Sequence, residues 1–524
     1  MINPKAGPCD EGAIRSVRTD PICAAANKRW VLAVTILGSA IAYIDGSVVN
    51  VALPAIEGDL DAPATVTQWI INAYTLCMAA LLLVGGATGD RFGRRLTFVV
   101  GLTIFAAASV WCGAGGSVTS LILARAVQGV GAAFLIPCSL ALIGASFDET
   151  ERGKAIGTWA GVSAIAAAIG PLLGGWIVDH ATWRWIFLIN PFLALPTVWI
   201  ALRHVPESRD EEATPGLDWP GALLVLTGLG SFVFGLIASS DLGWRNATVI
   251  ASIAAGAGLL IAFVWTERHS AAPMMPLDLF RSRVFTGVNL LTLLLYAALG
   301  GAFFFLPFDL IQVHSYSATQ AGAMFLPFTL VMAGLSRWSG GLLDRYGARR
   351  PLTLGPCIAA AGFALLALPG PGTDGPYGAT FLGPMVVVGL GMAVSVAPLT
   401  TAVMNAVPAH RTGVASGVNN AVAAVASLLA VAIFGAVALT VLDRAIDRGA
   451  ATATVSAEAK RALEAARGRF VIAPALVNLQ GEDRRAAEAI AKDSLATGIR
   501  AVMLLAAALA LGGAACAAWA TRSR

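Results

Sequence analysis

The sequence predicts an all-α polytopic membrane protein, and two observations carry that prediction. Of the 524 residues, 57% are hydrophobic and only 13% are charged, whereas charged residues make up about 25% of soluble globular domains. The apolar residues also gather into runs of about 20, the length that an α-helix needs to cross a bilayer. The net charge of +4 is small, so a basic nucleic-acid-binding surface is not expected.

Fourteen apolar runs are predicted to be transmembrane helices. They cover residues 30–53, 66–88, 96–115, 119–146, 154–178, 185–204, 218–239, 248–266, 284–307, 319–342, 352–369, 378–405, 412–441 and 498–520. The predicted organisation is a cytoplasmic tail (1–29), a first six-helix half (30–204), a linker with two inserted helices (205–266) and a second six-helix half (267–524). Segment 443–497 is polar and helix-favouring, so an external excursion is expected there. It is either a solvated cap or a surface for a partner such as a periplasmic adaptor.

The basic residues predict the orientation. If the N-terminus is inside, the cytoplasmic segments carry 21 of the 35 Lys and Arg residues, and the short external loops carry only Arg184 and Arg245. The positive-inside rule favours this arrangement. We therefore expect a multi-pass protein of the inner (plasma) membrane with both termini in the cytoplasm.

A Gly-rich basic loop occurs twice, as Gly86 to Arg95 and again 254 residues later as Gly340 to Arg349. A repeat in the same direction predicts two halves of the same topology. An acid at a helix end can cap a helix or pair with an arginine, and glycine permits a tight turn. The predicted latch consists of Gly86, Asp90, Arg91, Gly93, Arg94 and Arg95, and its second copy of Asp344, Arg345, Gly347 and Arg349. The alternative is simple positive-inside anchoring, which explains the arginines but not the glycine spacing.

Asp45 puts one carboxylate inside the first apolar run. Counted from Trp30 at about 1.5 Å per residue, it lies roughly 22 Å along the helix, past the middle of a hydrocarbon layer of about 30 Å. A charge there is costly, and its default interpretation is a functional group facing the protein interior or a wet cavity. The alternative is an acid near the outer interface that reaches water.

Several motifs resemble those of one family. The duplicated loop resembles the Gly-x-x-x-Asp-Arg-x-Gly-Arg-Arg motif of the major facilitator superfamily. Leu121-x-x-x-Arg125-x-x-Gln128-Gly129 resembles its fourth-span motif, and the run from Gly161 to Gly175 is similar to the fifth-span motif of its antiporters. The stretches Asp45 to Pro54 and Trp183 to Pro191 resemble the fourteen-span drug:proton antiporter branch. The resemblance implies a major facilitator fold of two six-helix halves plus two inserted helices.

The resemblance also places Arg125 near the first span. A permanently charged guanidinium in the membrane needs a carboxylate, carbonyl groups or water, so we expect Arg125 to face Asp45 or carbonyl groups beside it. Structural bracing is the alternative. Asp309, near the external end of the ninth span, is either a second proton or cation site or a hydrated interfacial acid.

Two further sets of residues are candidates. Four glycines give the fifth span a small-residue face and a proline bends it, which predicts either a rocking hinge or close static packing at Gly161, Gly170, Pro171, Gly174 and Gly175. Aromatic residues predict a tentative apolar substrate pocket, although they also fit lipid-facing or core positions: Tyr74, Phe134, Phe303, Phe304 and Phe325.

The resemblance implies proton-coupled efflux of lipophilic, cationic or amphipathic drugs by alternating access. The proton gradient would drive it without a bound cofactor or metal, and the partners would be the substrate, protons and lipid. Asp45 would carry the proton, because burial favours a neutral acid and a close guanidinium favours the carboxylate, and substrate would compete for the same group. Alternatives are an exporter dedicated to one metabolite or lipid, or a membrane sensor or channel. An enzyme is not expected, since the chain has no nucleotide-binding Gly-Lys-Ser/Thr loop and no zinc-type histidine spacing.

Overall fold

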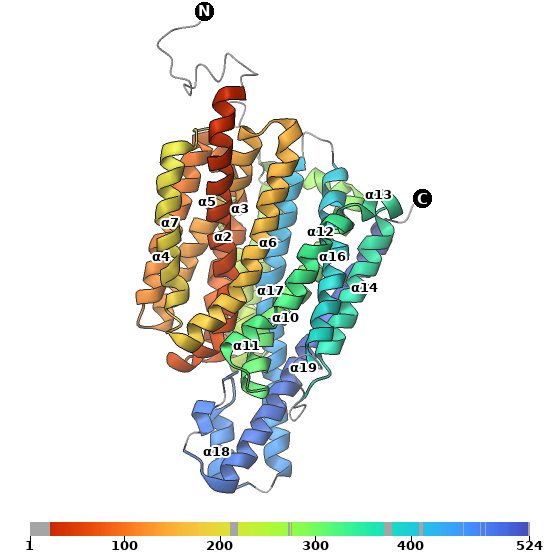
Figure 1. Ribbon diagram of the computed structural model, residues 1–524. Helices are drawn as coiled ribbons and strands as arrows, with labels where there is room; N and C mark the ends of the chain where they lie inside the picture. The colour runs from red at the N-terminus through yellow and green to blue at the C-terminus, as the bar shows by residue number, and fades with distance from the viewer. Residues whose placement is uncertain are drawn as a thin grey trace, which may run out of the picture.

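The computed structural model confirms the all-α prediction. It describes residues 21–209, 218–270, 273, 275–370, 380–407, 412–453, 455–471, 473–476 and 478–521, and within these ranges all regular elements are helical (Figure 1). Thirteen helices in the described ranges are long and apolar enough to cross a membrane. The protein is therefore a multi-pass membrane protein.

The first half contains six helices. They are α2 (Pro21–Asp59), α3 (Ala64–Phe92), α4 (Arg94–Ala114), α5 (Val118–Ser146), α6 (Glu149–His180) and α7 (Trp185–His204). Helices α2 and α4 each pack against both α5 and α7, and α3 packs closely on α5. Five of the six helices begin or end within a few residues of a predicted boundary. The exception is α2, in which additional helix carrying Lys28 precedes the predicted apolar run. That side chain is paired with Asp148 and Glu151 at the start of α6.

The second half follows a hairpin of α8 (Trp219–Leu242) and α9 (Ala247–His269). Its helices are α10 (Arg283–Phe308), α11 (Ala318–Ala323), α12 (Leu326–Gly340), α13 (Leu342–Tyr346), α14 (Arg349–Leu366), α16 (Leu382–Asn405), α17 (Thr412–Thr452), α18 (Ala457–Ala465) and α19 (Gly481–Ala520). Helix α14 coincides with the eleventh predicted span and packs on α16 and α19. Its first turn contains Arg349, Arg350 and Pro351, which lowers its hydropathy below that of the other thirteen.

One predicted span is interrupted. Residues 319–342 form two helices, α11 and α12, with a break at Met324 and Phe325. Pro327 lies in the first turn of α12, where its missing N–H costs nothing, whereas in a continuous helix it would remove a hydrogen bond. The proline therefore explains why α12 begins where it does.

The two longest helices define the ends of the molecule. Helices α17 and α19 have 41 and 40 residues, about 60 Å at 1.5 Å per residue, which is twice the hydrocarbon thickness. Both extend beyond the bundle at one end, where α18 joins them, while α2 begins and α19 finishes at the opposite end (Figure 1). We call these the α18 end and the termini end.

The halves meet along two seams. On one flank α3 packs against α17, and on the other α6 packs against α11 and α12. The inserted hairpin lies on the first flank, because α8 contacts both α3 and α17. This arrangement leaves α2, α4, α5 and α7 to enclose the interior of the first half.

Candidate functional site

Asp45 and Arg125 form a fully buried ion pair. Arg125 Nη1 lies 2.5 Å from Asp45 Oδ2, and neither side chain has any exposed surface. Asp45 is on α2, and Arg125 lies about two turns after the start of α5. The pair therefore joins two helices across the interior of the first half. An isolated charge at such a position would be strongly destabilising, and the partner offsets that cost.

Neutral donors complete the surroundings of the Asp45 carboxylate. Gln128 Nε2 donates to Asp45 Oδ1 at 2.8 Å, and Asn190 Nδ2 donates to the same oxygen at 2.9 Å. The same two amides also contact Ser109 Oγ, at 2.8 and 3.2 Å. Charge and hydrogen bonds together therefore favour the carboxylate form of Asp45 in this conformation.

Arg125 is held by more than its ion pair. Its Nε donates to the Ile70 carbonyl oxygen at 3.1 Å and its Nη1 to Gln128 Oε1 at 2.6 Å. The guanidinium carbon lies 4.2 Å from the centroid of the Tyr74 ring and 5.7 Å from that of Phe187, so two aromatic faces also stabilise the cation. Both alternatives that the sequence left open, an ion pair with Asp45 and structural bracing, are present at once.

This geometry differs from the expectation that substrate and proton compete at Asp45. The hydrogen bonds to the carboxylate come from α5 and α7, which are helices of the first half, and Asp45 has no accessible surface. A substrate between the two halves would therefore not reach it in this conformation. The alternative of an interfacial acid reaching water is also ruled out for this conformation by the complete burial.

A second carboxylate joins the two halves at the α18 end. Asp179, near the end of α6, accepts the Ala318 N–H at 3.1 Å and the Thr319 N–H at 2.7 Å. The next N–H of α11, that of Gln320, goes to the Ser317 hydroxyl at 3.2 Å. The first amides of α11 would otherwise lack partners, so a side chain from the first half completes a helix start in the second.

The glycines of α6 permit this close approach. A Cβ on Gly175 would overlap the carbonyl oxygen of Ala318, and one on Gly322 would overlap that of Pro171. Gly170 and Gly174 face Ser47 and Val48 of α2 instead. The candidate hinge residues thus serve two contacts, one within the first half and one between halves, whereas Gly161 has open space around it.

The first Gly-rich loop has a well-defined structure at the termini end. Asp90 Oδ1 pairs with Arg94, 2.8 Å from Nη2, between the last turn of α3 and the first turn of α4. The capping carboxylate for α4 is Glu207, which accepts the N–H groups of Arg95 and Leu96 at 2.9 and 3.0 Å. Of the two roles expected of Asp90, pairing with an arginine is observed here, and the helix-capping role belongs to Glu207.

Gly93 permits the tight turn between α3 and α4. Its φ of 123° is a backbone conformation that favours glycine, and a Cβ there would lie 2.7 Å from the Glu207 carboxyl carbon. In the second loop Gly347 also has a positive φ, 70°. The other latch residues of both loops lie at the termini end as well: Gly86, Arg91, Arg345 and Arg349. The Asp344 side chain is outside the described part of the structure.

Asp309 is in an unusual stretch of helix. It begins a π-helical turn, Asp309–Val313, that continues α10, and Asp309 is only 6% exposed. Its Oδ2 lies 3.8 Å from Nε2 of His314. Burial contradicts the expectation of a hydrated interfacial acid, and π-turns of this kind are frequent at functional sites.

The tentative pocket aromatics are divided between the two halves. Phe303 and Phe325 contact each other, with ring centroids 5.0 Å apart, in the second half. Phe304 is buried beside Phe305, Tyr74 lies under Arg125, and Phe134 packs on Gly101 of α4. A shared substrate pocket lined by these five residues therefore stays a prediction.

Sequence reasoning missed several residues of this arrangement. Gln128 and Asn190 stood within recognised motifs but were not assigned to the site, and an amide side chain inside an apolar run was the available signal. Ser109, Asp179, Glu207 and Glu57 gave no local signal, because their partners are distant in the sequence.

Two same-facing six-helix halves, an inserted hairpin and a buried charge pair define a polytopic membrane carrier. The sequence pattern of the family described as Major Facilitator Superfamily matches residues 35–226 and 219–431. The chain belongs to this superfamily, as its loop motifs indicated, and it is a transporter and not an enzyme.

Proteins of known name are similar over most of the chain. A multidrug resistance protein, Stp, of Mycobacterium tuberculosis is 32% identical and covers 91% of this chain and 89% of its own. The puromycin resistance protein pur8 of Streptomyces alboniger is 37% identical, with 78% and 81% covered. The tetracenomycin C resistance and export protein of Streptomyces glaucescens is 33% identical, with 76% and 74% covered.

Solved structures agree on the fold. A bacterial homologue of the human lysosomal transporter Spinster, in an inward-facing and unoccupied conformation, superposes with a TM-score of 0.65 at 17% identity. The match covers 94% of this chain and 97% of that one. At this identity the likeness concerns the fold alone.

Proposed function

We propose that the protein exports lipophilic, cationic or amphipathic drugs from the cytoplasm in exchange for protons, by alternating access of its two halves. The observation that carries the proposal is the buried Asp45 and Arg125 pair inside a two-half carrier. Similarity to proteins named for drug and antibiotic resistance or export supports the direction and the substrate class. The proton gradient supplies the energy, with no bound cofactor.

The charge distribution supports the orientation of the carrier. The termini end carries the basic loops, including Arg91, Arg95 and Arg349, and the positive-inside rule assigns that end to the cytoplasm of an inner (plasma) membrane. The α18 end is then external. The contact of Asp179 with α11 closes the halves on the external side, so the conformation described here is the externally closed one of the cycle.

The surroundings of Asp45 suggest how proton binding is coupled to movement. Asp45 accepts hydrogen bonds from three donors, on Arg125, Gln128 and Asn190. A protonated carboxyl has a hydrogen to donate and no charge to offset the guanidinium. Its binding of a proton therefore weakens the pair with Arg125, and the helices α2, α5 and α7 rearrange around the neutral acid.

Indirect coupling follows from the burial of this site. Because Asp45 does not face the space between the halves, the proton acts by changing the packing of the first half and not by displacing substrate from the same group. Substrate then binds between the halves. Asp309, also buried, is a second candidate proton site in the other half.

Export by reconstituted vesicles tests the proposal. Wild-type protein in vesicles with an imposed pH gradient should transport a lipophilic cationic dye, and a protonophore should abolish the transport. Asp45→Asn should abolish proton-driven transport while retaining dye exchange down a concentration gradient. Full proton-driven transport by Asp45→Asn would overturn the assignment of Asp45. Transport of one metabolite or lipid only, with no dye transported, would favour the dedicated exporter.

A further inference from the structure

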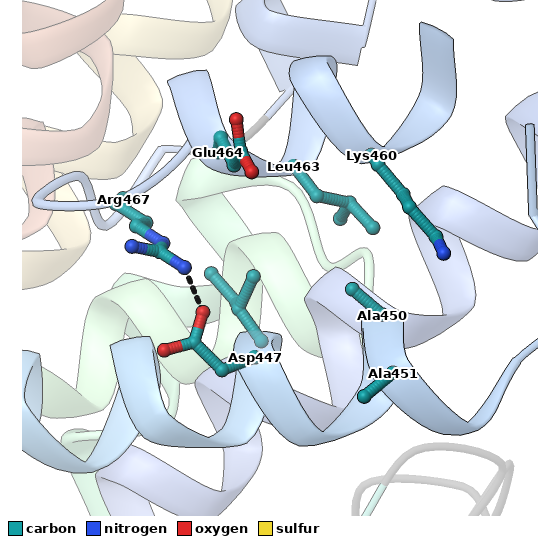
Figure 2. Close-up of a pocket in the computed structure, with 8 residues that line it drawn as sticks. Asp447, Ala450, Ala451, Lys460, Leu463, Glu464 and Arg467 are labelled. Carbon is teal, nitrogen blue, oxygen red and sulfur yellow. Dashed lines mark hydrogen bonds and ion pairs between the residues drawn. The ribbon is translucent and has the colours of Figure 1, made fainter. Parts of the chain in front are cut away.

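The external excursion does more than cover the bundle. Helix α18 packs on the extension of α19, and a cavity of about 240 Å³ lies between α17 and α18. Beyond α18 the chain returns to the bundle through residues 467–471, which we call the strap. Figure 2 shows where the strap begins, with the Arg467 guanidinium directed at the Asp447 carboxylate of α17.

The strap is anchored to the first half by backbone hydrogen bonds. Glu57, in the last turn of α2, accepts the N–H groups of Phe470 and Val471 on one oxygen, Oε1, at 3.0 and 2.9 Å. The Gly468 carbonyl oxygen accepts the Ala64 N–H at the start of α3 at 3.1 Å. Glu57 is only 3% exposed, so these amides take the place of the water that would bind an exposed side chain.

An ion pair on the surface adds to this anchor. Arg469 pairs with Asp61 in the short turn between α2 and α3. Gly468 has a φ of 70°, which favours glycine, and its N–H is 3.3 Å from Asp443 Oδ1 of α17. The turn at Gly468 thus directs one peptide toward α17 and the other toward α3.

The other side of the strap is seated on the second half. The Phe470 ring lies 5.2 Å from that of Phe305 and 5.3 Å from that of Phe308, measured between centroids, and both are in the last turns of α10. All three rings are at most 1% exposed. Phe470 therefore places its backbone on the first half and its ring on the second.

These contacts cross the seam that must open on the external side. The strap is continuous with α17 and α19, so it moves with the second half, and its bonds to Glu57, Asp61 and Ala64 must break when the halves separate there. We infer that the strap is an external latch, in which Glu57 holds the Phe470 and Val471 amides and stabilises the externally closed state. This inference rests on alternating access as proposed above, and adds a residue that sets the balance between its two states.

Substitutions at Glu57 separate the latch from simple packing. Both amides use a single oxygen, so Glu57→Gln keeps an acceptor in place, whereas Glu57→Met keeps the length of the side chain and removes the acceptor. Arg469→Ala removes the exposed ion pair without a change in the interior. The expected order of external opening is Glu57→Met above Arg469→Ala, with Glu57→Gln close to wild type.

The experiment measures the distance between the halves. Nitroxide labels on Thr182→Cys, after α6, and Asp493→Cys, on α19, report external separation in a background whose native cysteines have been replaced; both sites are exposed. Glu57→Met should raise the ratio of open to closed populations by about tenfold, the change expected from the loss of two buried hydrogen bonds.

The outcomes are distinct. If Glu57→Met and Arg469→Ala both give the wild-type distance distribution, the latch is refuted. If Glu57→Met fails to fold, Arg469→Ala alone still decides, since it should shift the distribution in the same direction by a smaller factor. Dye export by the labelled parent chain is measured in parallel. If the labelled parent chain does not export dye, the proposed function is refuted, whereas the measured distances still test whether the strap is a latch.

Discussion

The Asp179 carboxylate of α6 accepts the N–H of Thr319 at 2.7 Å, so a side chain of one half completes the first turn of a helix in the other. The Ala318 N–H is bound by the same carboxylate. If the halves part at this end, as alternating access requires, both amides lose their acceptor. In the proposed alternating access the contact is thus specific to the externally closed conformation, in contrast to the pair within the first half formed by Asp45 and Arg125.

Asp179→Ala should favour external opening. It removes both acceptors from the start of α11, and the ratio of open to closed states should rise by about threefold to tenfold, less than for a buried group because Asp179 is exposed. Distances between labels at Thr182 and Asp493 measure the ratio. Asp179→Asn keeps one acceptor and should give an intermediate value, and a larger effect for Asn than for Ala would contradict the capping explanation.

Gly175→Ala and Gly322→Ala should impair closure at the same seam. Each added Cβ would overlap a carbonyl oxygen of the facing helix, and overpacking of this kind costs about 1–3 kcal/mol, which lowers the closed population roughly tenfold. Dye export in vesicles should fall with it. Gly161→Ala is the matched control, because it adds the same methyl group to α6 where no atom lies within 4 Å. Equal loss in all three variants would refute a role for close packing.

Removal of one member of the buried pair should be more damaging than removal of both. Arg125→Gln leaves the Asp45 charge without a counterion and should lower the free energy of unfolding by about 3–5 kcal/mol. The double variant Asp45→Asn with Arg125→Gln leaves no charge and should recover a large part of that loss. Thermal unfolding in detergent measures both, with the exposed Arg91→Gln as control. Additive losses in the double variant would show that the two side chains do not interact.

Glu207→Ala should loosen the first turn of α4. The carboxylate binds the N–H groups of Arg95 and Leu96, and loss of such a cap costs about 0.5–2 kcal/mol. Hydrogen exchange of the amides at residues 94–97 should become faster, with the rest of α4 unchanged. Glu207→Gln retains one acceptor and should show a smaller effect. No change in exchange for either variant would mean that the cap does not stabilise the turn.

The fold was largely predictable from the sequence because membrane spans are read from continuous runs. Length and hydropathy located α8 and α9 as well as the two halves, and the duplicated loop indicated that the halves face the same way. The break between α11 and α12 was not predicted, since residues 319–342 are mostly apolar and only Pro327 signals a helix start. Helix α2 also begins earlier than its apolar run.

The site was predictable only in part, because its partners come from separate helices. A buried charge at Asp45 and another at Arg125 each stand out against an apolar background, so both were identified. Ser109, Gln128 and Asn190 are neutral, and only the packing of α4, α5 and α7 around α2 shows that they converge. Glu57 lies at a span end, where an acid is ordinary, and its amide partners are more than 400 residues away in the sequence.

The α8 and α9 hairpin has a consequence for how a lipid-dissolved compound enters the carrier. Because α8 lies against both α3 and α17, it covers that seam. The opposite seam, where α6 meets α11 and α12, has no such hairpin among the described helices. For the lipophilic substrate proposed above, sideways entry from a leaflet is therefore expected at the seam between α6 and α12 and not at the seam that α8 covers.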